Sequence, residues 1–225
     1  MEYYKKGAKN MHNLYQNILN ALQKEDKEQA VHLSIEALET KQVSVIELYE
    51  QILRPALASV VEEFEDENDL IWKEHVRSAI IRTIIECAYP YVLKEQASVE
   101  GEREKVIVMC PELEDHELGA KMVADFFQVA GFNAYFIGAR TPFKTIINAI
   151  RDVQPKYLVI SVTNFYHLLS VKRLIEDIKE ITTTDLTFVL GGRAIDANPN
   201  SVSETGADIH LRHFEDIQQL IEVEK

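Results

Sequence analysis

Two side chains that could do chemistry together, Glu114 and His116, follow the apolar run Lys105–Cys110, which has the composition of a β-strand. A neutral imidazole is a good ligand for a transition metal. A metal-bound histidine usually donates its other ring N–H to a carboxylate, and Glu114 is placed to accept it. Because no second ligand lies nearby, the pattern does not favour zinc. It favours a metal that brings its own equatorial ligands.

Small and polar residues follow this run and the other apolar runs of the same half of the chain. They are Gly119, Gly138, Ser161, Thr163, Gly191 and Gly192. Glycines allow a bulky group to approach the backbone. Ligands of open parallel sheets bind beyond the carboxyl ends of the strands, where these residues are expected to meet His116. Ser161, from the neighbouring strand, could extend the hydrogen-bond relay that begins at Glu114.

The elements that must position these residues alternate between apolar runs and helical stretches from residue 105 onward. The runs are Lys105–Cys110, Asn133–Ile137, Tyr157–Val162, Thr187–Leu190 and, more weakly, Ala207–His210. Near-continuous apolar strands that alternate with helices indicate a parallel sheet covered on both faces. We therefore expect residues 105–225 to form a flavodoxin-like (Rossmann-type) domain with a five-stranded parallel sheet, closed by a helix from Phe214 to Glu224.

The N-terminal part of the chain, residues 1–97, shows helical periodicity and has no glycine between Gly7 and Gly101. Asp26 is a candidate N-cap, and Ser44 with Glu47 matches a capping box. Pro55 interrupts the third helical stretch and should bend it or leave a carbonyl unpaired. With a fourth helix from about residue 72 to 94, the pattern predicts an antiparallel four-helix bundle. The polar stretch 98–104 is the expected linker.

The composition excludes several classes of function. The chain has 225 residues and a formal net charge of −13, so its surface repels phosphate backbones and direct nucleic-acid binding is not expected. No apolar run is long enough for a membrane span, and the N-terminus does not resemble a secretory signal. The two cysteines, Cys87 and Cys110, have no metal-site or disulfide spacing, which favours the reducing cytoplasm.

Taken together, Glu114-x-His116-x-x-Gly119, Ser161-x-Thr163 and Gly191-Gly192 resemble the signature of cobalamin-binding proteins. This family includes methionine synthases, corrinoid carrier proteins and adenosylcobalamin-dependent photoreceptors. The resemblance implies that His116 replaces the dimethylbenzimidazole tail as the lower ligand of cobalt and that Glu114 orients it. It also implies that the corrinoid contacts the rest of the motif: Asp115, Gly119, Ser161, Thr163, Gly191 and Gly192, the last four around the tail slot.

The helical half resembles the cap bundle of the same family. That bundle often carries Trp, nine residues and then Glu-His; here Phe64 precedes Glu74 and His75 at the same spacing. The resemblance implies that these three residues lie over the upper face of the corrin, although His75 could equally be a solvent-facing helix residue. Phe64 in place of Trp is ambiguous, because a Phe caps a methyl ligand in methionine synthase.

Two functions from different classes remain open. The Glu at 114, in place of the Asp more usual in methyl-transferring members, and the Glu74–His75 pair favour a non-enzymatic, adenosylcobalamin-dependent light sensor. Such a sensor would act in transcription regulation through a protein partner or a change of homo-oligomer, since no DNA-binding segment precedes the bundle. The alternative is a corrinoid carrier protein of a methyltransferase system, using methylcobalamin. A third hypothesis is that the domain has kept the fold but no longer binds the cofactor.

Overall fold

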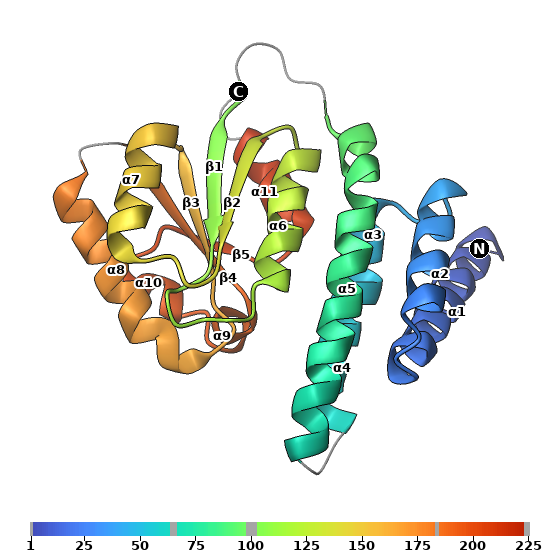
Figure 1. The fold of residues 1–225 in the computed structure, drawn as a ribbon. Coiled ribbons are helices and arrows are strands. Elements are labelled where there is room, and N and C mark those ends of the chain that lie inside the picture. The colour runs from blue at the N-terminus through green and yellow to red at the C-terminus, as the bar shows by residue number, and fades with distance from the viewer. Residues whose placement is uncertain (1, 64–66, 98–102, 183–184, 223–225) are drawn as a thin grey trace. The chain divides into compact units, whose positions relative to one another are not determined.

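The computed structural model describes residues 2–63, 67–97, 103–182 and 185–222. The chain divides into two compact units, Met1–Glu95 and Gln96–Lys225 (Figure 1). Most of the expected linker, residues 98–102, and the expected aromatic cap residue, Phe64, lie outside the described residues. The first unit is helical and the second is an α/β unit, as the sequence predicts.

The helical unit contains the four predicted helical stretches, but the third is divided. The elements are α1 (Glu2–Gln23), α2 (Lys27–Glu39), α3 (Val45–Glu47), the π-helical segment η1 (Leu48–Leu53), α4 (Arg54–Glu63) and α5 (Glu67–Glu95). The last helix begins five residues earlier than expected.

Both predicted helix starts are confirmed in detail. The Asp26 side chain accepts a hydrogen bond from the Gln29 N–H at 3.0 Å. At the start of α3, Ser44 Oγ accepts from the Glu47 N–H at 3.2 Å, and Glu47 Oε2 accepts from the Ser44 N–H at 2.8 Å. This reciprocal pair satisfies two backbone donors that a helix start otherwise leaves unpaired.

The expected interruption at Pro55 takes the form of a π-helical turn. Proline has no N–H, and its ring clashes with the carbonyl four residues earlier in a regular α-helix. In the turn before Pro55 the backbone widens, so that the Arg54 N–H donates to the Tyr49 carbonyl five residues back. The helical direction therefore continues from η1 into α4 with one wide turn in place of a sharp kink.

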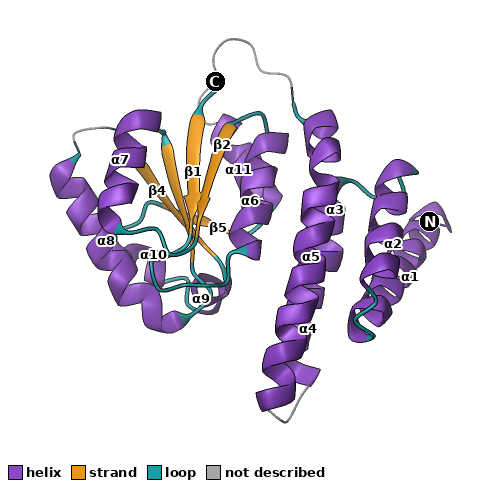
Figure 2. Cartoon of the chain, viewed as in Figure 1, coloured by secondary structure: helices purple, strands orange, loops and turns teal. Residues whose placement is uncertain are grey.

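The α/β unit is built on a five-stranded, entirely parallel sheet (Figure 2). Its strands are β1 (Lys105–Met109), β2 (Asn133–Gly138), β3 (Tyr157–Ser161), β4 (Thr187–Gly191) and β5 (Ile209–Leu211). They lie in the order β2-β1-β3-β4-β5, which is the flavodoxin-like order. The predicted fold class is confirmed. The fifth strand begins two residues later than expected, because Asp208 pairs with the backbone of Phe188 before the ladder starts.

Helices cover both faces of this sheet, as near-continuous burial of the strands requires. Figure 1 shows α6 (Leu118–Val129) and α11 (Phe214–Glu222) on one face and α7 (Phe143–Val153) and α8 (Leu168–Ile181) on the other. Three short helical segments complete the unit: η2 (Phe165–His167), α9 (Arg193–Ala197) and α10 (Ser201–Thr205). An apolar core lies between the sheet and the helices α7 and α8, around Leu158, Ile160 and Ile175.

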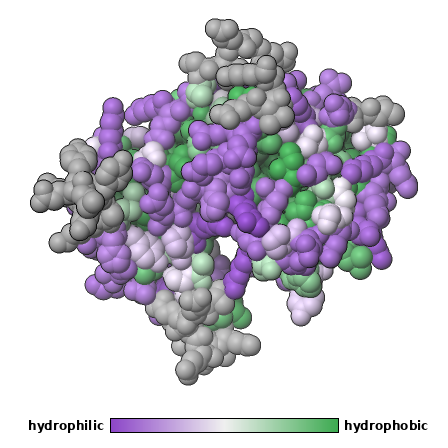
Figure 3. Space-filling model, turned by 180° about the vertical axis from the view of Figure 1, so that it is seen from behind, coloured by the Kyte–Doolittle hydropathy of each residue, from purple (hydrophilic) through white to green (hydrophobic). Residues whose placement is uncertain are grey.

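The surface agrees with the acidic composition. On the face drawn in Figure 3, hydrophilic side chains predominate and apolar side chains show as small separate groups. Among the helices of the described residues, none combines the length and the apolar character that crossing a bilayer requires.

Candidate functional site

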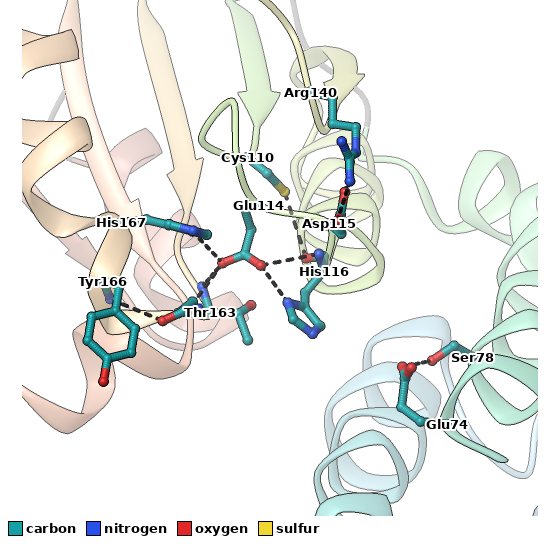
Figure 4. Close-up of polar contacts among 11 residues, drawn as sticks. Glu74, Ser78, Cys110, Glu114, Asp115, His116, Arg140, Thr163, Tyr166 and His167 are labelled. Atoms are coloured by element: carbon teal, nitrogen blue, oxygen red, sulfur yellow. Dashed lines mark hydrogen bonds and ion pairs between the residues drawn. The ribbon is translucent and has the colours of Figure 1, made fainter. Parts of the chain in front are cut away.

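The candidate site lies in the loops that follow the parallel strands at their carboxyl ends. The loop between β1 and α6 carries Glu114, Asp115 and His116 (Figure 4). Its neighbours are the loop after β2 and the loop after β3, because both strands pair directly with β1. The sheet order therefore brings three loops together that are distant in the sequence.

Glu114 and His116 form the pair that the sequence predicts. Glu114 Oε1 lies 2.5 Å from His116 Nδ1 and also accepts the His116 backbone N–H at 3.3 Å. The Glu114 side chain is 1 % exposed, whereas that of His116 is 60 % exposed. With Nδ1–H directed at the carboxylate, the neutral ring keeps its lone pair on Nε2. The imidazole thus has a fixed tautomer and an exposed donor nitrogen, the arrangement of a metal-binding histidine with its supporting carboxylate.

The second oxygen of Glu114 is held by the loop after β3. Oε2 accepts the backbone N–H groups of Thr163 and Asn164 at 3.1 and 2.8 Å. It also lies 3.3 Å from Nδ1 of His167 in η2 (Figure 4). His167 is not part of the motif that the sequence indicates, and the structure places its ring against Glu114. It was missed because it lies 53 residues from Glu114, and only the pairing of β1 with β3 brings the two together.

The electrostatics of Glu114 follow from these contacts. Burial by itself raises the pKa of a carboxyl group, because it penalises the charged form. At Glu114 the hydrogen bonds from His116 and from the Asn164 N–H outweigh burial and hold the pKa below its ordinary value. The carboxylate is therefore ionised at neutral pH and remains an acceptor for the imidazole N–H.

The other acids of this loop tie it to the loop after β2. Asp115 forms a bidentate ion pair with Arg140, one arm of which joins Oδ2 to Nη2 at 2.6 Å. The Arg140 guanidinium holds the pKa of Asp115 below its usual range. Glu117 Oε2 accepts the Ala139 N–H at 3.1 Å. Asp115 therefore braces the loop that carries His116, while its role as a corrinoid contact stays a prediction. Arg140 and Glu117 each follow a predicted strand, and this position is the sequence feature from which their place near the site could have been predicted.

Cys110 lies beneath the same loop, with Sγ 3.8 Å from the His116 carbonyl oxygen. Burial, together with the nearby carboxylates of Glu114 and Glu117, raises the pKa of its thiol to about 12.

This pKa predicts a difference in reactivity between the two cysteines. At pH 8 only about one Cys110 thiol in 10⁴ is ionised, and the thiolate is the nucleophile. Cys87 is exposed on α5. Iodoacetamide at pH 8 should therefore add one label per folded chain, at Cys87, and a second only after denaturation. Peptide mass spectrometry reads both sites, and equal labelling of the folded protein would contradict the burial of Cys110.

The three glycines of the motif differ in what surrounds them. A Cβ added at Gly119, near the start of α6, would meet no atom of the protein within 4 Å. A Cβ at Gly191 would lie 2.7 Å from the Leu211 carbonyl oxygen, and one at Gly192 would lie 2.6 Å from that of Val162. The packing of the protein itself therefore requires glycine at 191 and 192, whereas a side chain at 119 would meet open space.

Ser161 and Thr163 lie where the sequence places them, at and just after the carboxyl end of β3. Ser161 is buried and pairs with Gly191 in register. Within the described residues, the hydrogen bonds to Glu114 from this side come from the Thr163 and Asn164 backbone and from His167, not from Ser161. The proposed extension of the relay through Ser161 is replaced by these three donors. The predicted tail slot along Ser161, Thr163, Gly191 and Gly192 stays a prediction.

The predicted cap residues belong to the helical unit. Glu74 and His75 lie on α5, where Glu74 Oε1 accepts a hydrogen bond from Ser78 Oγ at 2.6 Å. His75 Nε2 lies 3.6 Å from Glu74 Oε2, and its side chain is 73 % exposed. Their contact with an upper ligand stays a prediction, as does that of Phe64.

Comparison with known proteins gives a consistent picture over both units. A family model described as "B12 binding domain" matches residues 104–221, and a second model of the same description matches residues 14–88. Trimethylamine corrinoid protein 1 of Methanosarcina acetivorans is 24 % identical over 195 residues, covering 85 % of this chain and 88 % of its own. Trimethylamine corrinoid protein 2 of Methanosarcina mazei is also 24 % identical, over 194 residues.

The fold agrees with a solved corrinoid protein. The structure of the Methanosarcina barkeri monomethylamine corrinoid protein superposes with a TM-score of 0.78 at 18 % identity, covering 93 % of this chain and 97 % of the other. These findings contradict the interpretation as a light sensor in transcription regulation. The relatives found are methylamine corrinoid proteins and not photoreceptors, so the sensor interpretation and its regulatory partner are not supported.

Proposed function

Because this chain belongs to the B12-binding domain family, we propose that it is a corrinoid carrier protein that brings a methyl group to and from partner methyltransferases. This was the alternative that the sequence left open. The main support is that relatives named as trimethylamine corrinoid proteins align with both units, over 85 % of the chain. The names describe corrinoid proteins and not enzymes, in agreement with the expectation that the chain itself is not an enzyme.

The residues of the site fit a cobalamin. His116 offers the exposed Nε2 of a ring whose other nitrogen is held by a buried carboxylate, which suits cobalt coordinated on four sides by its own macrocycle. A Cβ at Gly119, in the same motif, would meet open space, which leaves room for a bulky group to approach the backbone. When bound, the cobalamin supplies the cobalt that accepts and releases the methyl group. The chain holds the lower ligand in one tautomer and orientation throughout.

A carrier role also implies a different form of the cofactor from the one expected for a sensor. The preference for adenosylcobalamin came with the sensor interpretation, whereas a methyl carrier uses methylcobalamin. The expected partner becomes a methyltransferase, and the names of the relatives suggest methylated amines as the methyl source.

The test is a methyl-transfer assay on the full chain loaded with hydroxocobalamin and reduced with titanium(III) citrate. Addition of a purified trimethylamine or monomethylamine methyltransferase with its amine should convert the bound corrinoid to the methylated form, seen in the absorption spectrum. Omission of the enzyme or of the amine should prevent the change. Chemical methylation with iodomethane provides the positive control for the spectrum. A protein that binds cobalamin and methylates with iodomethane, but not with either enzyme, would contradict the proposed donors.

Substitutions at Gly119 should affect the stability of the apo-protein and its affinity for cobalamin in different ways. In the apo-protein, Gly119→Ala should raise the free energy of unfolding by about 0.5–1 kcal/mol, since alanine suits a helix better than glycine. Gly119→Leu should leave the apo-protein folded but weaken hydroxocobalamin binding, because its side chain fills space that the protein leaves empty. Urea unfolding and equilibrium dialysis measure the two effects. Unchanged cobalamin affinity in Gly119→Leu would place the corrinoid elsewhere.

A further inference from the structure

We propose that His167 is a second positioning residue of this site: it donates its Nδ1–H to Glu114 and thereby fixes the carboxylate that holds the cobalt ligand. The inference rests on the proposed cobalamin binding and adds a histidine that the motif does not include. The contact joins His167 Nδ1 to Glu114 Oε2 at 3.3 Å. The result is a carboxylate bridged between two imidazoles, one exposed and one largely buried (Figure 4).

The turn that carries His167 is itself ordered by hydrogen bonds that direct the ring inward. Asn164 caps η2, with its side chain accepting the Tyr166 N–H at 3.0 Å and its carbonyl accepting the His167 N–H at 3.0 Å. Ser170 Oγ donates to the His167 carbonyl at 2.7 Å. The His167 side chain is only 15 % exposed, whereas Tyr166 beside it is 88 % exposed. The ring is therefore held inside the loop, against Glu114.

The contact acts on His116 through the geometry of the carboxylate. The two Glu114 oxygens contact different partners: Oε1 contacts the ring of His116, and Oε2 contacts the loop after β3. The backbone donors of Thr163 and Asn164 approach Oε2 from the strand end, and His167 approaches from η2. A side-chain donor on this oxygen limits rotation of the carboxylate about its last bond. Rotation of that group would turn Oε1 away from Nδ1 and release the ring of His116.

The experiment compares two variants that differ in one hydrogen bond. In His167→Asn, the amide Nδ2 stands close to the position of the imidazole Nδ1 and can still donate to Glu114. In His167→Leu, a side chain of similar bulk cannot donate. Each full-length variant is titrated with hydroxocobalamin, and the Co(II) form is examined by electron paramagnetic resonance. The protein is labelled with the heavy nitrogen isotope, so the splitting from that isotope reports the bond between cobalt and the imidazole, separately from any bond to the cofactor's own dimethylbenzimidazole. Thermal unfolding of the apo-proteins reports the structural effect separately.

His167→Leu should bind hydroxocobalamin about 10-fold more weakly than the wild type, the scale on which loss of a supporting partner lowers metal affinity. Its nitrogen splitting should be reduced, and His167→Asn should restore both properties. If both variants lower the melting temperature alike while affinity and splitting stay at wild-type values, His167 is only structural and the proposal is wrong. If wild type and a His116→Ala variant give the same spectrum, the cobalt ligand itself is misassigned, which is failure of the proposed site and not of His167 alone.

Discussion

Replacement of His116 by alanine is expected to remove the nitrogen ligand of cobalt and to weaken cobalamin binding more than any other single change in the α/β unit. Loss of a residue that merely supports a metal ligand costs about 10–100-fold in affinity, so loss of the ligand itself should exceed that range. The apo-protein should be little affected. The His116 side chain is 60 % exposed, and Glu114 keeps the Thr163 and Asn164 donors on its other oxygen.

The measurement combines a hydroxocobalamin titration with the electron paramagnetic resonance spectrum of the Co(II) form. The matched control is His32→Ala, which removes an exposed histidine, 74 % exposed, from α2 in the helical unit. The protein and the added imidazole carry the heavy nitrogen isotope, because the cofactor's own dimethylbenzimidazole gives an ordinary nitrogen splitting when it coordinates cobalt. Millimolar labelled imidazole should restore the heavy-isotope splitting in His116→Ala if the site is intact and only the ligand is missing. A heavy-isotope splitting that persists in His116→Ala without added imidazole would place the ligand on another residue.

Much of the architecture could be predicted because its signals are local. The runs Lys105–Cys110 and Tyr157–Val162 are almost continuously apolar and rich in β-branched residues, which favours strands buried on both faces. The helix starts at Asp26 and Ser44 are encoded within four residues. The π-helical turn before Pro55 could not be predicted in the same way. A proline can kink a helix, end it or widen one turn, and the choice depends on how the following segment packs.

The site was predictable where its residues are close in sequence and not where they are distant. Glu114 and His116 are two residues apart, so their contact follows from the motif. His167 and Arg140 reach the same loop only through the strand order β2-β1-β3. Nothing in the residues around them indicates which loop they will meet. The Ser161 relay failed for the related reason that backbone N–H groups, which carry no sequence signature, took the place of its hydroxyl.

The wrong functional interpretation has a physical explanation as well. It weighed Glu against Asp at position 114, but a carboxylate of either length can accept an imidazole N–H when the loop adjusts to it. Here the loop does adjust, through Asp115 to Arg140 and Glu117 to Ala139, so that Glu114 reaches His116 at 2.5 Å. The identity of the acid at 114 is therefore related to how the lower ligand is held. It does not indicate which upper ligand the cobalt carries.

Substitution of Gly192 by alanine is expected to be among the most destabilising changes in the α/β unit, by about 2–6 kcal/mol in the free energy of unfolding. The residue has φ +98° and ψ 168°, a region that is essentially limited to glycine and that costs a residue with a side chain about 1–3 kcal/mol. Its new Cβ would also lie 2.6 Å from the Val162 carbonyl oxygen, and relieving such overpacking costs about 1–3 kcal/mol. Urea unfolding of the apo-protein measures the sum.

Gly206→Ala is the control, because it also has a positive φ but lacks the clash. Gly206 has φ +78° and lies in the left-handed helical region, and a Cβ there would meet only Ile175 Cγ2, at 4.0 Å. It should lose only about 1–2 kcal/mol, so a larger loss in Gly192→Ala measures the contact with Val162 together with the less favourable backbone of Gly192. That contact matters for the site, since Val162 donates its N–H to Gly191 and accepts that of Ala194, and Thr163 and Asn164 follow it directly. Equal losses in the two variants would show that Val162 can move aside. A larger loss in Gly192→Ala would show that this glycine is required by the loop that holds Glu114, whether or not a corrinoid tail lies against it.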